Sequence, residues 1–399
     1  MTRIIKSNLR YYQRDILITT LFLCVLGLLM IFSASGSVVY FKRQLIFVAA
    51  GFAVCFVVQY LDYRKLYRYA KYIFLFSIFC VFLLKTPAGV TVNGATRWLK
   101  IAGIQFQVAE VVKIGVIIIL GNMIKKHRRS LDRIKLLIQM WLLGGGAAGL
   151  LLIISNDLSS SIVILGITFC MTFLFTSHLW IHLGAIGSVG CAATIYVMSI
   201  WNNMPDPKEL EEMSFRVGRI AAWLDPYRYE SNQGYQTLQA LYAIGRGGLV
   251  GKFLGNSLQK FMIPEPHTDM IFAILCEELG LTGAVVLFIL LSFLIYCLIQ
   301  TAIMTDDLFG SAITTGVAAH IAVQSLINLS VSLNLLPNTG IALPFISYGG
   351  TAVFTLLCEI ALVLSVSRIA NGLHFFSWLK SKQRVKNSKQ KIRRKRRDA

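Results

Sequence analysis

Residues Ile16 to Ser35 read ILITTLFLCVLGLLMIFSAS, and this run sets the class of structure. It contains no charged residue, and it is long enough to cross the hydrocarbon core of a bilayer as a helix, which takes roughly 20 apolar residues. Similar runs recur along the whole 399-residue chain, which is 56% apolar and only 15% charged. Because a soluble domain is roughly 25% charged, the composition excludes a soluble fold and predicts a polytopic membrane protein.

The fold class predicted from these runs is all-α, a membrane bundle of about ten transmembrane helices with one long extracytoplasmic loop. The first run leads directly into further spans without a convincing cleavage site, and we therefore interpret it as an uncleaved helix and not as a signal peptide. The loop is the polar segment from Trp201 to about Asp269. The predicted helices are 16–35, 44–61, 70–84, 106–124, 136–154, 160–177, 179–200, 270–300, 310–333 and 349–368.

Lysine and arginine residues predict the orientation of the bundle. They gather in residues 3–14, 64–71 and 125–135 and in the tail after Arg368. Cytoplasmic loops are enriched in these residues, so both termini are expected to be cytoplasmic. We divide the chain into a transmembrane domain, 1–375, with its outer loop at about 201–269, and a basic tail, 376–399, expected to be a disordered arm held against anionic lipid. The net charge of +20 then reflects topology and lipid contact, and nucleic acid is not expected as a partner.

Charged residues inside spans are candidates for function, because each costs several kcal/mol unless it is paired or hydrated. Glu110 and Lys113 lie three apart on one helix face, where they can neutralise each other. This pair is either a structural ion pair or part of a site. Glu277 and Glu278 are adjacent and point to different faces, so at least one must face the bundle interior or a polar cavity. Glu359 in the last span is a weaker candidate of the same kind.

The beginning of the outer loop is predicted to form a helix over residues 205–223. Arg216, Arg219 and Trp223 would share one face of it. The helix either lies in the interface with its tryptophan as an anchor or contacts an anionic headgroup, and both can hold. No metal site is expected, because the paired histidines of residues 178–182 lack a third ligand. Among the histidines, His267 is the only one that the sequence places where it could contribute to a functional site.

Four segments together carry a resemblance to a known family. They are NGATRWL (93–99) with FQVAEVVK (106–113); GYQ (234–236) through GNSLQK (255–260); PEPHTDMIF (264–272) with EELG (277–280); and LPNTG (336–340) with LPFISYGG (343–350). In this order on a ten-span frame they are similar to the SEDS family (FtsW, RodA and SpoVE), and the resemblance covers nearly the whole chain. The GNSLQK segment is nearer to the FtsW and SpoVE branch than to the RodA branch.

The resemblance implies a peptidoglycan glycosyltransferase that polymerises lipid II on the outer face of the cytoplasmic (inner) membrane during cell division or sporulation. The acceptor hydroxyl would attack the anomeric carbon of the donor, which requires a carboxylate base and cations for the departing diphosphate. A divalent cation, Mg²⁺ or Mn²⁺, at the diphosphate is left open, and no other cofactor is expected. The implied partners are a class B penicillin-binding transpeptidase, other division or sporulation proteins and membrane lipids. The expected substrate-binding residues are Arg97, Glu110, Lys113, Arg216, Arg219, Gln236, Arg246, Lys260, His267, Asp269, Ser347 and Gly349.

The chain departs from the family pattern at the catalytic base. The family usually carries an aspartate five residues before the glycine of GYQ, and this chain has Tyr229 there, which is no base at neutral pH. Glu230 and Asp225 are the expected catalytic residues, with Glu230 preferred because Asp225 precedes a proline and can simply start a turn. Two alternatives stay open. The departure would fit a non-catalytic divisome scaffold, and the buried charges would fit a flippase or transporter of a lipid-linked precursor.

Overall fold

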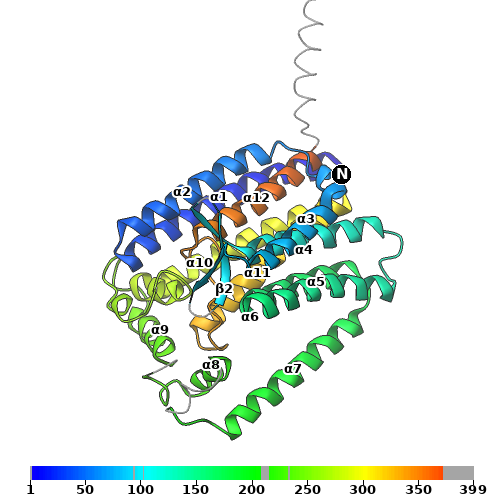
Figure 1. Cartoon of the computed structure of the whole chain (residues 1–399). Coiled ribbons are helices and arrows are strands. Elements are labelled where there is room, and N and C mark those ends of the chain that lie inside the picture. The colour runs from blue at the N-terminus through cyan, green and yellow to red at the C-terminus, as the bar shows by residue number, and fades with distance from the viewer. Residues whose placement is uncertain (1, 93–94, 102, 208–214, 232–233, 372–399) are drawn as a thin grey trace, which may run out of the picture.

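The computed structural model describes residues 2–92, 95–101, 103–207, 215–231 and 234–371, and it contains all ten predicted spans as helices (Figure 1). The predicted basic tail, 376–399, lies outside these residues. The long helices are α1 (Thr2–Ser35), α2 (Val38–Val58), α3 (Arg64–Leu83), α4 (Val108–Lys126), α5 (Ile134–Ser155), α6 (Leu158–Phe175), α7 (Leu179–Asn202), α10 (Ile271–Ile303), α11 (Leu308–Ser332) and α12 (Gly350–Ala370).

Nine of the helices among the described residues are long and apolar enough to cross a membrane. The tenth, α4, carries Glu110, Lys113, Lys125 and Lys126, and it is buried along most of its length. Its neighbours in space are therefore other helices of the bundle more than lipid, so it tolerates charges that a lipid-facing helix would not. The predicted polytopic all-α bundle is confirmed.

A small sheet between α3 and α4 covers part of one end of the bundle. Its strands β1 (Gly89–Val92), β2 (Ala95–Ile101) and β3 (Ile104–Gln107) are antiparallel and follow one another in order. Ala95 and Leu99 lie on the same face of β2, since residues two and four apart share a face of a strand, and both are buried. The sheet connects α3 to α4 and places Arg97 at the end of the bundle.

Polar contacts between helix ends and loops distinguish the two ends of the bundle. At one end, Trp223 Nε1 donates to the oxygen of Asn334 (3.0 Å), and the amide of Tyr348 donates to the oxygen of His267 (2.8 Å). We call this the loop end. At the opposite end, which we call the basic end, Lys125 of α4 forms an ion pair with Asp307 before α11 (2.8 Å).

Helix α10 is broken near its beginning. Its 33 residues would measure about 50 Å as a continuous helix, against about 30 Å of hydrocarbon. Gly280 interrupts it with φ of 65° and ψ of −164°. The amides of Leu281 and Thr282 instead donate to the oxygens of Gly248 and Leu249, at 2.9 and 3.1 Å. Residues 281–303 therefore form the span, and residues 271–279 belong to the loop end.

Two shorter helices, α8 (Phe215–Leu224) and α9 (Gly234–Gly247), lie in the outer loop. The predicted helix over 205–223 overlaps α8, and its residues 208–214 lie outside the described part of the chain. The neighbouring span α7 stands apart from the other helices (Figure 1), with only 6% of its most apolar window buried against 72% for α11. Its buried residues are His182 near one end and Ile200 near the other, so lipid must surround most of it.

Candidate functional site

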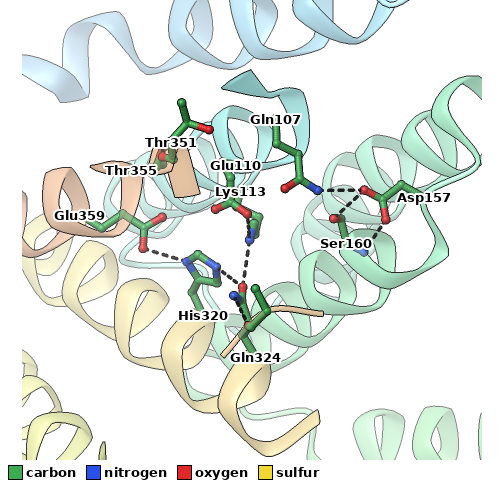
Figure 2. A network of polar contacts seen from close by, with 11 residues as sticks. Gln107, Glu110, Lys113, Asp157, Ser160, His320, Gln324, Thr351, Thr355 and Glu359 are labelled. Atoms are coloured by element: carbon green, nitrogen blue, oxygen red, sulfur yellow. Dashed lines mark hydrogen bonds and ion pairs between the residues drawn. The ribbon is translucent and has the colours of Figure 1, made fainter. Parts of the chain in front are cut away.

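A chain of buried polar contacts runs through the bundle (Figure 2). Lys113 Nζ donates to Glu110 Oε1 (2.6 Å) and to Gln324 Oε1 (3.0 Å). His320 lies between Gln324 Oε1 (2.9 Å) and Glu359 Oε2 (2.8 Å) through its two ring nitrogens. We call Glu110, Lys113, His320, Gln324 and Glu359 the buried network. The predicted Glu110–Lys113 pair is thus confirmed, as one part of a larger assembly from α4, α11 and α12.

Three arginines meet at the loop end. Arg97 of β2 donates to the backbone oxygen of Asn156 (3.2 Å), and Arg216 of α8 donates to Asn156 Oδ1 (2.6 Å). Asn156 caps α5 with φ of 54°, a left-handed conformation that asparagine tolerates better than most residues. Burial lowers the pKa of Arg219, and the nearby charge of Arg97 lowers it further, while the charge of Asp269 opposes them. The three cations therefore share one electrostatic environment.

Asp269 is the carboxylate of this environment. Its Oδ1 accepts from Gln236 Nε2 (3.4 Å) and from the hydroxyl of Thr268 (3.1 Å), and Asn338 donates to Gln236 Oε1 (3.0 Å). Burial raises the pKa of Asp269, against the lowering effects of its hydrogen bonds and of Arg219. We call Arg97, Arg216, Arg219, Gln236, Asp269 and Asn338 the mouth cluster. With three arginines and one aspartate, its formal net charge is +2.

One helix joins the mouth cluster to the buried network. On α11, Gln324 Nε2 donates to the oxygen of Ala342 (2.9 Å). One turn further, Asn328 Nδ2 donates to the oxygens of Ile341 and Asp269, both at 2.7 Å. Since residues four apart share a helix face, this face of α11 holds both Asp269 and residues 341–342, which follow the LPNTG segment, in place. The site thus extends from the loop end into the bundle.

Several polar atoms at the loop end are buried without a hydrogen-bond partner among the described residues. They include Arg97 Nε, Thr339 Oγ1 and His267 Nδ1. An unsatisfied buried polar group costs about 1–3 kcal/mol, so such atoms are expected to have a partner in the working protein. Their occurrence beside a cluster of net positive charge indicates a site for a polar anionic ligand.

His267, Ser347 and Gly349 have structural contacts. The ring of His267 packs against Tyr40 and Tyr348, with centroids 4.5 and 5.3 Å apart, and burial lowers its pKa. Ser347 Oγ accepts from the amide of Leu343 (2.8 Å). The amide of Gly349, at the beginning of α12, donates to Gln44 Oε1 (3.3 Å).

Glu277 and Glu278 lie in a second charged region, which also contains Arg246 and Lys260. The carboxylate of Glu277 accepts from the hydroxyl of Ser257 and from the amides of residues 258 and 259, and it pairs with Arg246 (3.6 Å). Glu278 accepts from the hydroxyl of Ser33 at 2.6 and 2.7 Å, and Lys260 Nζ donates to the oxygen of Gly255 (2.7 Å). We call this region the clasp. Among the described residues, the contacts of Arg246 and Lys260 hold a loop together and do not join these cations to the mouth cluster.

The residues considered for the base have three different environments. Tyr229 is fully buried against Ile200 and residues 221–222, and its hydroxyl donates to the oxygen of Pro205 (2.7 Å). Asp225 Oδ1 accepts from the amide of Arg228 (3.1 Å), as expected for a residue that starts a turn. Glu230 is exposed, and its carboxylate makes no hydrogen bond or ion pair with the described residues.

The sequence did not reveal the part of the site contributed by α11. His320, Gln324 and Asn328 lie in an apolar span without a charged residue, and the sequence analysis singled out only His267 among the histidines. Their spacing of four residues was the available signal, because it places three polar side chains on one helix face. Asn156 was not singled out from the sequence either, although both Arg97 and Arg216 donate to it.

Comparison with known proteins places the chain in a family. Residues 14–372 match the family model described as "Cell cycle protein", which covers FtsW, RodA and SpoVE. The chain belongs to this family. It is 32% identical over 366 residues to Stage V sporulation protein E of Bacillus subtilis, covering 88% of this chain and 96% of the relative. It is 33% identical over 378 residues to the probable peptidoglycan glycosyltransferase FtsW of Coxiella burnetii, covering 91% of this chain and 98% of the relative.

Solved structures agree with this assignment. A chain of a peptidoglycan synthase complex, described for the coordination of polymerisation and crosslinking, superposes with a TM-score of 0.72 at 26% identity, covering 89% of this chain and 97% of the other. The rod shape determining protein RodA of Thermus thermophilus superposes with a TM-score of 0.63 at 26% identity, covering 88% and 95%. The predicted family and fold are therefore confirmed.

Proposed function

We propose that this chain is a peptidoglycan glycosyltransferase that polymerises lipid II, and that the mouth cluster binds the diphosphate of the substrate. The observation that carries the proposal is that Arg97 and Arg216 meet at Asn156, while Arg219 lies near both Arg97 and the carboxylate of Asp269, at the end of a membrane bundle. A net charge of +2 complements a diphosphate, and arginine is suited to bind phosphate through two parallel hydrogen bonds. Lipid tails reach this position without leaving the membrane.

The arginines would contribute most to the chemical step. The acceptor hydroxyl forms a bond to the anomeric carbon of the donor as the bond from that carbon to the diphosphate oxygen breaks, and negative charge develops on the leaving diphosphate. Fixed cations aimed at developing charge lower the barrier because they need no reorganisation during the reaction. Arg97 and Arg216 are already held by Asn156, so they are oriented before the substrate binds. A Mg²⁺ or Mn²⁺ ion, which proteins bind through one or two carboxylates plus substrate phosphates, would find one such carboxylate in Asp269.

We assign the general base to Glu230. Its carboxylate is exposed and uncommitted among the described residues, and it lies in the connection between α8, which carries two of the arginines, and α9, which carries Gln236. Asp225 is the second choice because its side chain already accepts the amide of Arg228. Tyr229 is not a candidate, since its hydroxyl is buried and donates to a backbone carbonyl.

We place the chain in the cytoplasmic membrane with both termini inside and the mouth cluster outside. The cluster of basic residues over 125–135 at the basic end supports this orientation by the positive-inside rule. The predicted partner is a class B penicillin-binding transpeptidase, which would crosslink the strands as they form. The RodA-like chain of the solved synthase complex supports a partner of this kind.

A second candidate function, a non-catalytic scaffold, is favoured by one observation. Tyr229 replaces the family's usual aspartate and is built into a small core with Ile200. The flippase alternative has lost part of its motivation, because Glu277 and Glu278 are committed to the clasp. The assay below separates the glycosyltransferase from both alternatives, because neither a scaffold nor a flippase makes glycan strands.

The test is strand synthesis from lipid II by the purified chain reconstituted with its transpeptidase. We expect glycan strands from the unaltered chain and from Arg228→Ala, since Arg228 is an exposed arginine paired with Asp206 outside the mouth cluster. Glu230→Gln is expected to reduce synthesis by two to four orders of magnitude, as loss of general base catalysis does. Unchanged synthesis by Glu230→Gln together with loss in Asp225→Asn would transfer the role to Asp225. No strands from the unaltered chain would favour the scaffold or the flippase, of which only the flippase would move the headgroup across the bilayer.

A further inference from the structure

The segment from Gly248 to Met262, which we call the clasp loop, exposes far more apolar surface than a water-facing loop should. Phe253 is 70% exposed and Phe261 is 77% exposed. The other large apolar side chains exposed in this loop are Leu249, Val250, Leu254, Leu258 and Met262. Scattered exposed apolar residues are ordinary on a protein surface, but a contiguous group marks an interaction site.

Hydrogen bonds fix the depth of this loop relative to two membrane spans. The amide of Gly255 donates to Ser33 Oγ (3.0 Å), in the last turn of α1. The oxygens of Gly248 and Leu249 accept from the first two residues of the spanning part of α10, at 2.9 and 3.1 Å. Residues 281–303 would measure about 35 Å as a helix, so both attachments lie where the spans reach the edge of about 30 Å of hydrocarbon.

The apolar surface of the loop is continuous with the lipid-facing surfaces of the same two spans. Leu281 is 55% exposed and follows Gly280, where the loop is attached to α10. Phe32 is 49% exposed and precedes Ser33, where the loop is attached to α1. Since lipid must cover these exposed positions of α1 and α10, it also reaches the adjoining loop.

Two further features match the membrane interface. Lys252 is exposed, and Lys260 Nζ lies 5.4 Å from the ring centroid of Phe261, so amines stand beside the apolar side chains, as in segments that bind anionic lipid surfaces. Phe253 has φ of 66°, a conformation that is unfavourable for a bulky side chain. Strain of this kind persists only where the surroundings require it.

We propose that the clasp loop inserts into the bilayer leaflet at the loop end, with Phe253 and Phe261 among the acyl chains and Lys252 and Lys260 at the phosphates of the phospholipids. The clasp would anchor the loop to the protein. Glu277 accepts hydrogen bonds from backbone amides of the loop, and Glu278 accepts one from Ser33, to which the loop also donates. The loop then sets the depth of α9, whose end it continues, in the membrane. This inference depends only on the membrane fold and not on the glycosyltransferase activity.

Fluorescence quenching in vesicles tests the proposal. The full chain carrying Cys191→Ser, in which the other seven cysteines are buried or half-buried, receives Phe253→Cys or Phe261→Cys and an environment-sensitive nitrobenzoxadiazole label. It is reconstituted in phosphatidylethanolamine and phosphatidylglycerol vesicles containing lipids spin-labelled near the top of the acyl chain, and iodide is added in parallel on both sides of the bilayer. Both loop positions are 70% or more exposed, so the changes should not prevent folding.

Two other positions calibrate the measurement. Ile289→Cys is the lipid control, since Ile289 is 57% exposed on the spanning part of α10, and Tyr227→Cys is the loop control, since Tyr227 is 65% exposed between α8 and α9. We expect the labels at 253 and 261 to be quenched by the spin-labelled lipid at least half as strongly as at 289, and by iodide several-fold less than at 227. Iodide quenching of both as strong as at 227 would overturn the proposal. So would protection that arises only when a transpeptidase is reconstituted with the chain, because the loop would then bind protein.

Discussion

The mouth cluster and the clasp are both charged regions at the loop end, but they use their charges differently. In the clasp, the carboxylates of Glu277 and Glu278 are fully buried and accept hydrogen bonds from serine hydroxyls and, for Glu277, from backbone amides. In the mouth cluster, Arg97 keeps a buried Nε without a hydrogen-bond partner among the described residues. Burial of a charge in a membrane bundle therefore does not identify function by itself. What distinguishes the mouth cluster is that one of its cations still has a buried donor to offer.

Removing an acid of the clasp should have a large effect on stability. Glu277→Ala leaves the hydroxyl of Ser257 and two backbone amides without their acceptor, and each unsatisfied buried donor costs about 1–3 kcal/mol. We expect a loss of about 3–5 kcal/mol in the free energy of unfolding, measured by denaturant titration in detergent. Glu230→Ala is the matched control and should leave stability unchanged. Equal stability of both variants would mean that the clasp does not hold the loop.

Replacing Tyr229 with the family's usual aspartate should destabilise the chain without increasing strand synthesis. Tyr229→Asp removes a buried aromatic ring, which costs about 3–5 kcal/mol in a core, and it buries a carboxylate among apolar neighbours. We expect this variant to unfold at lower temperature and to gain no strand synthesis, whereas Tyr229→Phe loses only one hydrogen bond, worth about 1 kcal/mol. A stable Tyr229→Asp variant with increased synthesis would show that the site can use a base at this position.

A substitution in the buried network should reduce stability less than the loss of Glu277 from the clasp. Gln324→Leu removes one acceptor of Lys113 and the donor to Ala342, but it leaves the ion pair between Glu110 and Lys113 intact. We expect a loss of about 1–3 kcal/mol in stability. The neighbouring Ser325→Ala is the control, because Ser325 Oγ has no partner in the structure. If the Gln324→Leu variant were as stable as the control, the account in which α11 supports the site would be contradicted.

The smallest effect should be a change in the dependence of stability on pH. Burial raises the pKa of Asp269 above its unfolded value, so the folded chain binds more protons than the unfolded chain between these two pKa values. Stability therefore falls as the pH rises through this window and is fully regained below the unfolded pKa. Relative to Asp269→Asn, the unaltered chain should gain stability on acidification from neutral pH. A parallel profile for both proteins would contradict the raised pKa.

The sequence predicted what depends on length and hydrophobicity, and it missed what depends on packing. The ten helices and the Glu110–Lys113 pair followed from apolar runs and from helical spacing. The break at Gly280 could not be predicted from the sequence. It leaves the amides of residues 281 and 282 without helical acceptors, and these amides donate instead to residues 248 and 249, more than thirty positions away in the chain. The pairing of His320 with Glu359 was missed for a similar reason, since neither residue is informative until α11 and α12 pack together.

The assignment of the substrate site is tested most directly by strand synthesis in a variant that carries both Arg216→Ala and Arg219→Ala. Its unfolding temperature must equal that of the unaltered protein, so that any loss of synthesis is not a loss of folding. Loss of one preorganised charge-stabilising group typically costs a factor of about 10² to 10³ in rate. We therefore expect synthesis to fall by at least a factor of about 100, while Arg228→Ala stays near the unaltered rate. Synthesis by the double variant at the rate of the Arg228→Ala control would contradict the assignment of the diphosphate to the mouth cluster.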